Sequence, residues 1–178
     1  AFNKNPDLVI ISNPTSLHSD TIIRAVQKGA DVITEKPGSA SLNEAKKVIK
    51  ILEKNKSKFL ISYQRRFHPL TEKFKKVIES NEIGNIYNIN VKLKSNVRNW
   101  HPYENYRELY ACNSQLGGGV LLTESHEIDL IMWIFGKPKK INSKVYQKTS
   151  FGLDVEDSAI LDLFYDKYKI NFSLDFMS

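Results

Sequence analysis

The first 63 residues alternate short apolar runs with segments of helical periodicity, and this alternation constrains the fold more than any other feature. Apolar runs at 8–11, 30–34 and 59–63 have the length of buried strands. The segments between them, at 19–28 and from Ser41 onward, place apolar side chains on one helical face. This strand–helix–strand–helix–strand order predicts a parallel sheet with right-handed crossovers.

The rest of the chain carries a different pattern. A helix opened by His68 and Pro69 is followed by a turn, and residues 86–94 then alternate polar and apolar side chains, as a half-exposed strand does. The remaining expected elements are a long loop over 96–115, a helix over 120–135, strands over 141–148, 158–164 and 168–176, and a hairpin turn at 165–167. These strands predict an antiparallel sheet in the second part of the chain.

Composition allows a packed core and narrows the classes of partner. The chain has 178 residues, 41% hydrophobic and 26% charged, which suits one ordinary domain or two small ones. The net charge of +6 comes mostly from lysines of one expected helix, a pattern more typical of a solvated helix face than of a surface for an acidic ligand. No aromatic residues are interleaved with these lysines, so nucleic acid is not an expected partner.

Cysteine usage and hydropathy bear on the location of the protein. Cys112 is the only cysteine, so no disulfide can form within the chain, and a reducing cytoplasm is the expected location. No apolar run is long enough to span a bilayer and no signal peptide is visible, so no membrane association is expected. The chain does not begin with methionine, so these expectations apply only to the residues present.

Glu35-Lys36-Pro37 directly follows the second expected strand, so Lys36 lies at the carboxyl end of that strand. In open α/β sheets, ligands bind at this edge. An ammonium group there can hydrogen-bond a substrate hydroxyl or carbonyl oxygen and stabilise the negative charge that develops on it. The alternative is an ordinary surface lysine after a strand.

The second candidate residue is His126, which lies in the apolar helix that follows Gly117-Gly118-Gly119. A histidine in such a helix can transfer a proton, whereas the alternative is a core histidine bonded to the backbone. The second histidine of a zinc-binding H-E-x-x-H motif is missing, because Leu130 stands in its place. No metal is therefore expected.

Four segments stand in a fixed order along the chain: Asn13-Pro14-Thr15-Ser16-Leu17-His18, Glu35-Lys36-Pro37, Tyr63-Gln64-Arg65-Arg66-Phe67 and residues 117–129. In this order they resemble the Gfo/Idh/MocA family of NAD(P)-dependent oxidoreductases, and the resemblance covers nearly all of the chain. It implies a fold of the α/β plus α+β class, in which a partial Rossmann-type parallel sheet is followed by an α/β domain with a mostly antiparallel sheet. It also implies hydride transfer between a nicotinamide cofactor, NAD or NADP, and a carbinol or keto carbon of a sugar, sugar nucleotide or cyclitol.

The resemblance assigns residues 1–66 to the C-terminal part of a Rossmann dinucleotide-binding domain. Residues 67–178 are assigned to an α/β domain for substrate binding and oligomerisation, expected to be incomplete. The family's glycine-rich phosphate loop is expected several tens of residues before Phe2, as is the residue that selects NAD or NADP, and neither is in this sequence. The chain alone is therefore expected to bind dinucleotide weakly and, through an exposed sheet edge, to self-associate.

The resemblance also assigns roles to individual residues. Lys36 and His126 are the expected catalytic residues, the lysine bound to the substrate oxygen and the histidine transferring a proton. The expected cofactor-binding residues are Asn13, Pro14, Thr15, His18, Glu35, Lys36, Gln64 and Arg65. The expected substrate-binding residues are Lys36, Trp100, His101, Tyr103, Arg107, Thr123 and His126.

One departure from the family concerns the proton relay. Many members carry an aspartate one turn before the histidine, and here Leu122 and Thr123 occupy those positions. Either the relay lacks that carboxylate, or Glu124 or Asp129 supplies it from another angle.

Residues 98–107 are rich in aromatic and basic side chains. They suit an anionic sugar or a sugar nucleotide, because aromatic faces stack on sugar rings and arginines bind carboxylates or phosphates. Packing against the sheet or a neighbouring subunit is the equal alternative. The expected partners are a small sugar-type substrate and further copies of the chain, joined through the antiparallel sheet. The alternative function is a non-catalytic remnant of the fold that binds a sugar ligand or a partner.

Overall fold

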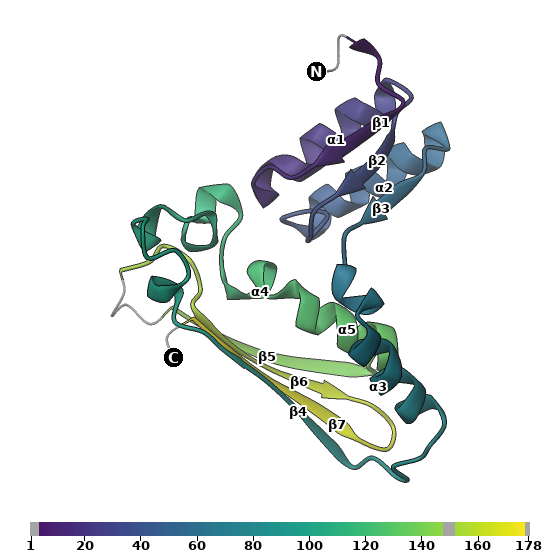
Figure 1. Ribbon diagram of the computed structural model, residues 1–178, viewed down its shortest axis with the longest axis vertical. Coiled ribbons are helices and arrows are strands. Elements are labelled where there is room, and N and C mark those ends of the chain that lie inside the picture. The colour runs from purple at the N-terminus through teal and green to yellow at the C-terminus, as the bar shows by residue number, and fades with distance from the viewer. Residues whose placement is uncertain (1–3, 148–151, 177–178) are drawn as a thin grey trace. The chain divides into compact units, whose positions relative to one another are not determined.

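A computed structural model describes residues 4–147 and 152–176, and these fall into two compact units. The first unit comprises residues 1–63 together with 115–118, and the second comprises residues 64–114 and 119–178. Figure 1 shows both, with a small sheet in the first and a longer sheet in the second. Residues 115–118 thus belong to the first unit, although the rest of that unit ends at residue 63.

The first unit contains the predicted parallel sheet. Its elements are β1 (Leu8–Ile11), η2 (Thr15–Leu17), α1 (His18–Gln27), β2 (Asp31–Thr34), α2 (Leu42–Asn55) and β3 (Phe59–Ile61). The strands pair in parallel in the order β1-β2-β3. The predicted helix start at Ser41 is confirmed, because its hydroxyl accepts a hydrogen bond from the Glu44 backbone N–H at 3.3 Å.

Both helices of the first unit pack on the same face of its sheet. Apolar side chains of the two helices form one core with alternate strand residues, chiefly Ile11, Val32, Ile22, Val26 and Val48. The strand residues in between point to the other face, because side chains alternate along a strand. That face carries large apolar side chains that stay exposed within the unit.

The second unit is built on a four-stranded sheet. Its elements are η3 (Gln64–Phe67), α3 (Pro69–Glu79), β4 (Asn88–Lys94), η4 (Val97–Asn99), η5 (Tyr106–Glu108), η6 (Tyr110–Cys112), η7 (Ser114–Leu116, shared with the first unit), α4 (Val120–Thr123), α5 (Ser125–Phe135), β5 (Lys140–Tyr146), β6 (Ser158–Phe164) and β7 (Lys169–Asp175). The strand order is β4-β7-β6-β5. The pairs β5–β6 and β6–β7 are antiparallel, whereas β4 and β7 pair in parallel. The sheet is therefore mostly antiparallel, as predicted, with one parallel pair at its edge.

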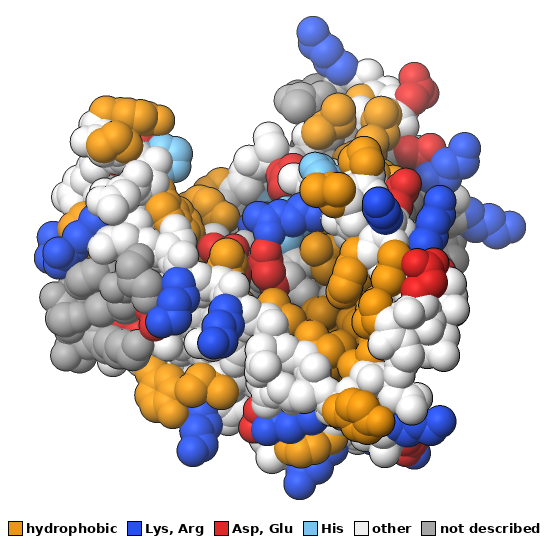
Figure 2. Space-filling view, turned by 60° about the horizontal axis from the view of Figure 1, so that its bottom comes forward, with side chains coloured by type: hydrophobic (Ala, Val, Ile, Leu, Met, Phe, Trp, Pro, Cys, Tyr) orange, Lys and Arg blue, Asp and Glu red, His pale blue; other side chains and the backbone are white. Residues whose placement is uncertain are grey.

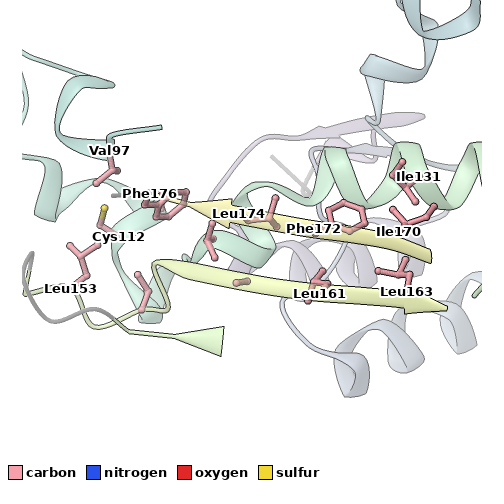
Figure 3. Packing of buried hydrophobic residues seen from close by; sticks show 14 residues of the cluster. Val97, Cys112, Ile131, Leu153, Leu161, Leu163, Ile170, Phe172, Leu174 and Phe176 are labelled. Atoms are coloured by element: carbon pink, nitrogen blue, oxygen red, sulfur yellow. The ribbon is translucent and has the colours of Figure 1, made fainter. Parts of the chain in front are cut away.

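The main core lies between this sheet and α4–α5. Figure 3 shows Phe172, Ile170, Leu161 and Leu163 on the sheet surface that faces Ile131 of α5. A second group at the other end of the sheet includes Val97, Cys112, Leu153 and Phe176, all nearly inaccessible to solvent. This continuous core fixes the helix that contains His126.

Three predicted elements differ in detail. The helix expected over 120–135 is divided at Glu124, where φ is -95° and ψ is 28°, so α5 begins anew just before His126. The loop expected over 96–115 contains four short 3-10 turns rather than one helical turn. The strand expected over 141–148 extends from 140 to 146, and residue 148 lies outside the described residues.

No helix in the described part of the chain is both long and apolar enough to cross a membrane. On the face shown in Figure 2, the Lys and Arg side chains are spread among acidic, polar and apolar ones instead of forming one continuous field.

Candidate active-site residues

In the first unit, the loops that follow β1 and β2 leave the sheet side by side. Ile11 and Thr34 are paired in the register, and the Glu35 backbone N–H donates to the Ile11 carbonyl at 2.8 Å. The loop of Asn13 and the loop of Lys36 therefore start from neighbouring strand ends. Both lie at the carboxyl edge of a parallel sheet, where open α/β folds bind ligands.

Lys36 is half-buried in the loop after β2. Its backbone N–H donates to the Glu35 carboxylate at 3.3 Å, and the Lys36–Pro37 peptide bond is cis. The Thr34 hydroxyl, buried at the end of β2, donates to the Glu35 carbonyl at 3.2 Å. Local hydrogen bonds thus hold the backbone on the N-terminal side of Lys36, so the lysine side chain starts from a defined position.

The Asn13 side chain has one satisfied and one unsatisfied end. Its amide nitrogen donates to the Thr21 hydroxyl at 3.1 Å. Its Oδ1 is buried and has no hydrogen-bond partner among the described residues. A buried acceptor without a donor is costly, so this oxygen fits a ligand that brings a hydroxyl or amide N–H. Asn13 is therefore the described residue of this loop that best fits a cofactor contact.

His18 begins α1 and is only 1% exposed. Its Nδ1 lies 2.7 Å from the Pro37 carbonyl oxygen, and its Nε2 lies 2.8 Å from the Asn13 carbonyl oxygen. The ring thus connects the two loops through their backbones. Both ring nitrogens are engaged within the protein.

The glycine run at 117–119 owes its composition to two close contacts. At Gly117, a Cβ atom would come within 2.9 Å of the Ser16 backbone nitrogen and the Thr15 Cβ. At Gly119, it would lie 2.3 Å from the Glu156 carboxylate. Both glycines also adopt positive φ, 77° and 102°, which other residues rarely do. Packing and backbone conformation therefore explain the glycines at 117 and 119.

In the second unit, His126 lies in the first turn of α5 and is 5% exposed. The neighbouring Thr123 and Ser125 are also buried. The Ser125 hydroxyl has no hydrogen-bond partner among the described residues. His126 is thus a buried polar side chain at the start of a mostly apolar helix, with two further buried polar residues close by in the sequence.

The start of α4, one turn before His126, is bound by Glu156. The Glu156 carbonyl accepts from the Val120 N–H at 3.0 Å, and its carboxylate accepts from the Leu121 N–H at 3.2 Å. A carboxylate at a helix N-terminus satisfies backbone donors that the helix leaves free. The sequence offers no local signal for this role of Glu156, because Glu156 lies 35 positions after Leu121.

Two neighbouring arginines of η3, Arg65 and Arg66, bind acidic residues of α5. Arg65 pairs with Glu127, and Arg66 forms a two-point contact with Asp129, with a distance of 2.7 Å from Nε to Oδ2. Because both oxygens of Asp129 are bound by Arg66, Asp129 is a poor candidate for the carboxylate of a proton relay with His126. Of the two carboxylates considered for the proton relay, Glu124 and Asp129, Glu124 remains the candidate.

In the loop between β4 and α4, some aromatic residues pack against the core and others are exposed. Trp100 donates from its indole nitrogen to the Ser95 hydroxyl and contacts Phe176 edge-to-face at 5.0 Å, so it packs, partly buried, against the core. His101 and Tyr103 contact each other, with 3.1 Å between Nδ1 and the phenol oxygen, and Tyr103 is 79% exposed. The Arg107 guanidinium lies 4.6 Å from the centre of the Tyr106 ring.

The end of this loop is fixed by a second acidic contact. Asp154 accepts from the Ser114 hydroxyl at 2.6 Å and from its backbone N–H at 3.0 Å, and these bonds lower the pKa of Asp154 below its usual value. Burial, together with the negative charge of Asp154, raises the pKa of the nearby Cys112 thiol to about 11. Cys112 is therefore a protonated, unreactive core residue.

The expected site residues are thus divided between the units. Asn13, Pro14, Thr15, His18, Glu35 and Lys36 lie in the first unit, and Gln64, Arg65, Trp100, His101, Tyr103, Arg107, Thr123 and His126 lie in the second. The described residues contain no cluster of acidic, histidine or cysteine side chains suited to a metal ion.

This combination of a half Rossmann sheet and an α/β domain defines the class of protein. A family model described as "Oxidoreductase family, NAD-binding Rossmann fold" matches residues 1–63, and one described as "Oxidoreductase family, C-terminal alpha/beta domain" matches residues 75–178. The chain belongs to the Gfo/Idh/MocA oxidoreductase family.

Individual relatives agree with this assignment. An uncharacterized oxidoreductase, C115.03 of Schizosaccharomyces pombe, is 31% identical over 90% of the chain and 43% of its own length. Inositol 2-dehydrogenase of Corynebacterium glutamicum is 27% identical over 81% of the chain and 40% of its own length. The chain spans less than half the length of these two relatives.

Among solved structures, the WlbA dehydrogenase from Bordetella pertussis, in complex with NADH and UDP-GlcNAcA, resembles the chain with a TM-score of 0.85. The alignment covers 100% of this chain and 52% of that one, at 19% sequence identity. At this identity the likeness shows the fold.

Proposed function

We propose that the protein of which this chain forms a part is an NAD(P)-dependent dehydrogenase or reductase acting on a carbinol or keto carbon of a sugar-type substrate. The observation that carries the proposal is the position of Lys36, directly after β2 and beside the loop of Asn13. Side chains at the carboxyl edge of a parallel sheet meet bound ligands in this class of fold.

In this proposal, Lys36 hydrogen-bonds the reacting oxygen of the substrate. Its ammonium group stabilises the negative charge on that oxygen as the carbon gains or loses a hydride. His126 transfers the proton that the oxygen gains or loses, since a histidine can act as acid or base near neutral pH. A bound nicotinamide cofactor supplies or accepts the hydride.

Asn13 is the residue proposed to hold the cofactor in the first unit. Its buried Oδ1 fits a donor from the cofactor, as described above. Pro14, Thr15, Glu35, Gln64 and Arg65 stay predictions as cofactor contacts. For Arg65, the ion pair with Glu127 means that a cofactor contact would have to share or replace that partner.

The substrate class is proposed to be a cyclitol, a sugar or a sugar nucleotide with an anionic group. The relatives support this class, because they include an inositol dehydrogenase and a dehydrogenase bound to UDP-GlcNAcA. In this chain, Arg107 and the exposed Tyr103 are the residues of the 98–107 loop suited to such a ligand, whereas Trp100 is packed against the core.

The assembly is proposed to be a homo-oligomer that forms through the sheet of the second unit and works in the cytoplasm. The free face of this sheet presents side chains from three adjacent strands, including Asn90, Asn171 and Asp162. The single cysteine, with its protonated thiol, suits a reducing compartment.

The test is Lys36→Ala in the full-length protein, assayed with NAD(H) and NADP(H) against a panel of inositols and uronic acid sugar nucleotides. We expect turnover to fall by ~10²–10³, because one charged donor to a developing oxyanion supports a rate of that order. The variant should still bind NAD(H) or NADP(H). Lys28→Ala, an exposed lysine that ends α1, is the matched control.

Near-normal turnover in the Lys36→Ala protein would remove Lys36 from the mechanism. If the unmodified protein binds a sugar of the panel but turns over none, the non-catalytic alternative holds.

A further inference from the structure

We infer that Ser19 and Glu44 are positioning residues, which hold the far side of the Lys36 loop (residues 35–41, between β2 and α2) so that the lysine starts from a fixed backbone. For its effect on activity, the inference rests on the proposed function of Lys36. Its structural part rests on contacts within the first unit alone. Neither Ser19 nor Glu44 is among the site residues expected from the sequence.

The near side of the Lys36 loop is held at the sheet. The Glu35 backbone N–H donates to the Ile11 carbonyl at 2.8 Å. Pro37, directly after Lys36, is buried. The backbone of residues 38–40, which leads from there to α2, therefore decides whether the far side is held as well.

The Glu44 carboxylate, in the first turn of α2, reaches back to this stretch. Its Oε2 accepts from the Ala40 backbone N–H at 3.2 Å and from the Ser19 hydroxyl at 3.4 Å. Hydrogen bonds to an ionised acceptor are roughly twice as strong as those between neutral groups. Glu44 thus fixes the last residue of the stretch to the start of α2.

Ser19 extends this contact to the preceding residue of the loop. Its hydroxyl lies 3.1 Å from the Ser39 hydroxyl. A hydroxyl both donates and accepts, so Ser19 can donate to Glu44 while it accepts from Ser39. Ser19 is 5% exposed and lies in α1, so these bonds join the Lys36 loop to both helices of the first unit.

Packing fixes the remaining residue of the stretch, Gly38. A Cβ atom there would come within 2.7 Å of Cδ1 and 3.2 Å of Cγ1 of Ile61, the last residue of β3. The loop backbone therefore lies directly against the end of the neighbouring strand. Residues 38–40 are thus held by one packing contact and by the hydrogen bonds of Ser19 and Glu44.

These contacts bear on the proposed chemistry because the ammonium group of Lys36 is only as well placed as the backbone that carries it. A misplacement of about 1 Å can cost ~10²-fold in rate. When the Glu44 carboxylate is lost, the far side of the loop is free to shift, and Lys36 then loses part of its effect on the reacting oxygen.

Four variants of the full-length protein separate the contacts. Glu44→Ala removes both bonds of the carboxylate, whereas Glu44→Gln keeps an amide oxygen that can accept from the Ala40 N–H. Ser19→Ala removes the hydroxyl that joins Ser39 to the carboxylate, and alanine suits a helix. Glu53→Ala is the matched control, because it removes an exposed carboxylate from the same helix.

The structural measurement is amide hydrogen exchange of residues 38–40. We expect roughly tenfold faster exchange in Glu44→Ala, because local opening of the loop becomes easier. Glu44→Gln and Glu53→Ala should stay close to the unmodified protein. Equal exchange at these amides in Glu44→Ala and Glu53→Ala would overturn the inference.

The kinetic measurement combines Glu44→Ala with Lys36→Ala. If Glu44 acts through Lys36, Glu44→Ala should lower turnover roughly 10- to 100-fold in the unmodified protein and change it little once Lys36 is replaced. Glu44→Gln should retain most of the turnover. An equal fold-loss from Glu44→Ala in both backgrounds would show a merely structural role and overturn the inference.

The two measurements also separate this inference from the proposed function. If Lys36→Ala alone leaves turnover near normal, the proposed role of Lys36 fails, and hydrogen exchange still decides whether Glu44 and Ser19 hold the loop. If Glu44→Ala does not fold, Ser19→Ala takes its place in both measurements, with the same expected directions and the same overturning results.

Discussion

The two sheets differ in the face that their own helices leave uncovered. In the first unit, this face carries a row of apolar side chains, Ile10, Ile33 and Leu60, which are opposite one another in the register. Ile10 is 71% exposed and Leu60 is 53% exposed within the unit.

In the second unit, the uncovered face is largely polar. Asn171 donates to Asn88 at 2.7 Å across the parallel pair, and Lys169 pairs with Asp162 at 3.0 Å across the neighbouring antiparallel pair. Polar side chains of this kind can face water without cost.

The difference follows from the two kinds of sheet. Parallel sheets are almost always covered on both faces, so their strands are apolar throughout, whereas antiparallel sheets commonly have one solvated face. The first sheet therefore has the composition of a sheet covered on both sides, and the second has that of a sheet with one polar face. The predictions below test this contrast, from the largest expected effect to the smallest.

Phe172→Ala should destabilise the second unit by about 3–5 kcal/mol, because it removes a fully buried aromatic side chain from the core in Figure 3. Both tryptophans, Trp100 and Trp133, lie in this unit, so tryptophan fluorescence during denaturant unfolding reports on it alone. Tyr87→Ala, at a residue that is 77% exposed, is the control. Equal unfolding midpoints for the two variants would contradict the described core.

Gly119→Ala should destabilise the start of α4 by roughly 1–3 kcal/mol. The added Cβ would lie 2.3 Å from the Glu156 carboxylate, and φ at this residue is 102°. Gly136→Ala is the matched control, because φ there is also positive but nothing lies within 4 Å of an added Cβ. The same fluorescence measurement compares them, and a Gly136 variant as unstable as the Gly119 variant would count against the Glu156 contact.

The Cys112 thiol should affect stability only at alkaline pH. Burial raises its pKa in the folded protein from 9.0 to about 11, so the folded state retains the proton that the unfolded state loses. This contribution is fully present below pH 9 and is lost as the pH rises towards 11. Cys112→Ala should show a shallower alkaline loss of stability in urea unfolding, and in the unmodified protein iodoacetamide should react slowly at neutral pH. Rapid labelling of the native protein would refute the burial of the thiol.

Ile10→Thr should change the stability of the first unit by no more than about 0.5 kcal/mol, because the side chain is largely exposed there. It should, however, reduce self-association of the chain in sedimentation velocity, since it breaks the apolar row. Val32→Thr, on the covered face at 1% exposure, should destabilise by more because it buries a hydroxyl. Amide hydrogen exchange of β1–β3 measures the stability of the first unit in both variants. A larger loss of stability for Ile10→Thr than for Val32→Thr would mean that the face with Ile10 is covered.

Much of the fold could be predicted because its signals are local. Ser41 and Glu44 mark the start of α2 by their own hydrogen bond, and Gly29, with φ of 83°, follows the end of α1. The position of Lys36 is also local, because it follows its strand directly. The division of the helix at Glu124 left no signal in the periodicity, since apolar side chains continue on both sides of it.

What could not be predicted depends on pairs of residues far apart in the sequence. The ion pairs of Arg65 and Arg66 could not be predicted, because their partners on α5 lie more than 60 residues away in the sequence. For the loop of Trp100, sugar contact and packing were equal alternatives, and the packing of its ring against Phe176 depends on a residue 76 positions away in the sequence.

The sequence by itself determined most of the segments that form strands and helices, and that Lys36 and His126 are candidates for chemistry. It could do so because caps, turns and periodicity act over a few residues. The tertiary structure decided which polar groups are already bound: both nitrogens of His18, both oxygens of Asp129 and the carboxylate of Glu156. These depend on packing that brings distant segments together, and burial then makes each unpaired donor or acceptor too costly to leave unsatisfied.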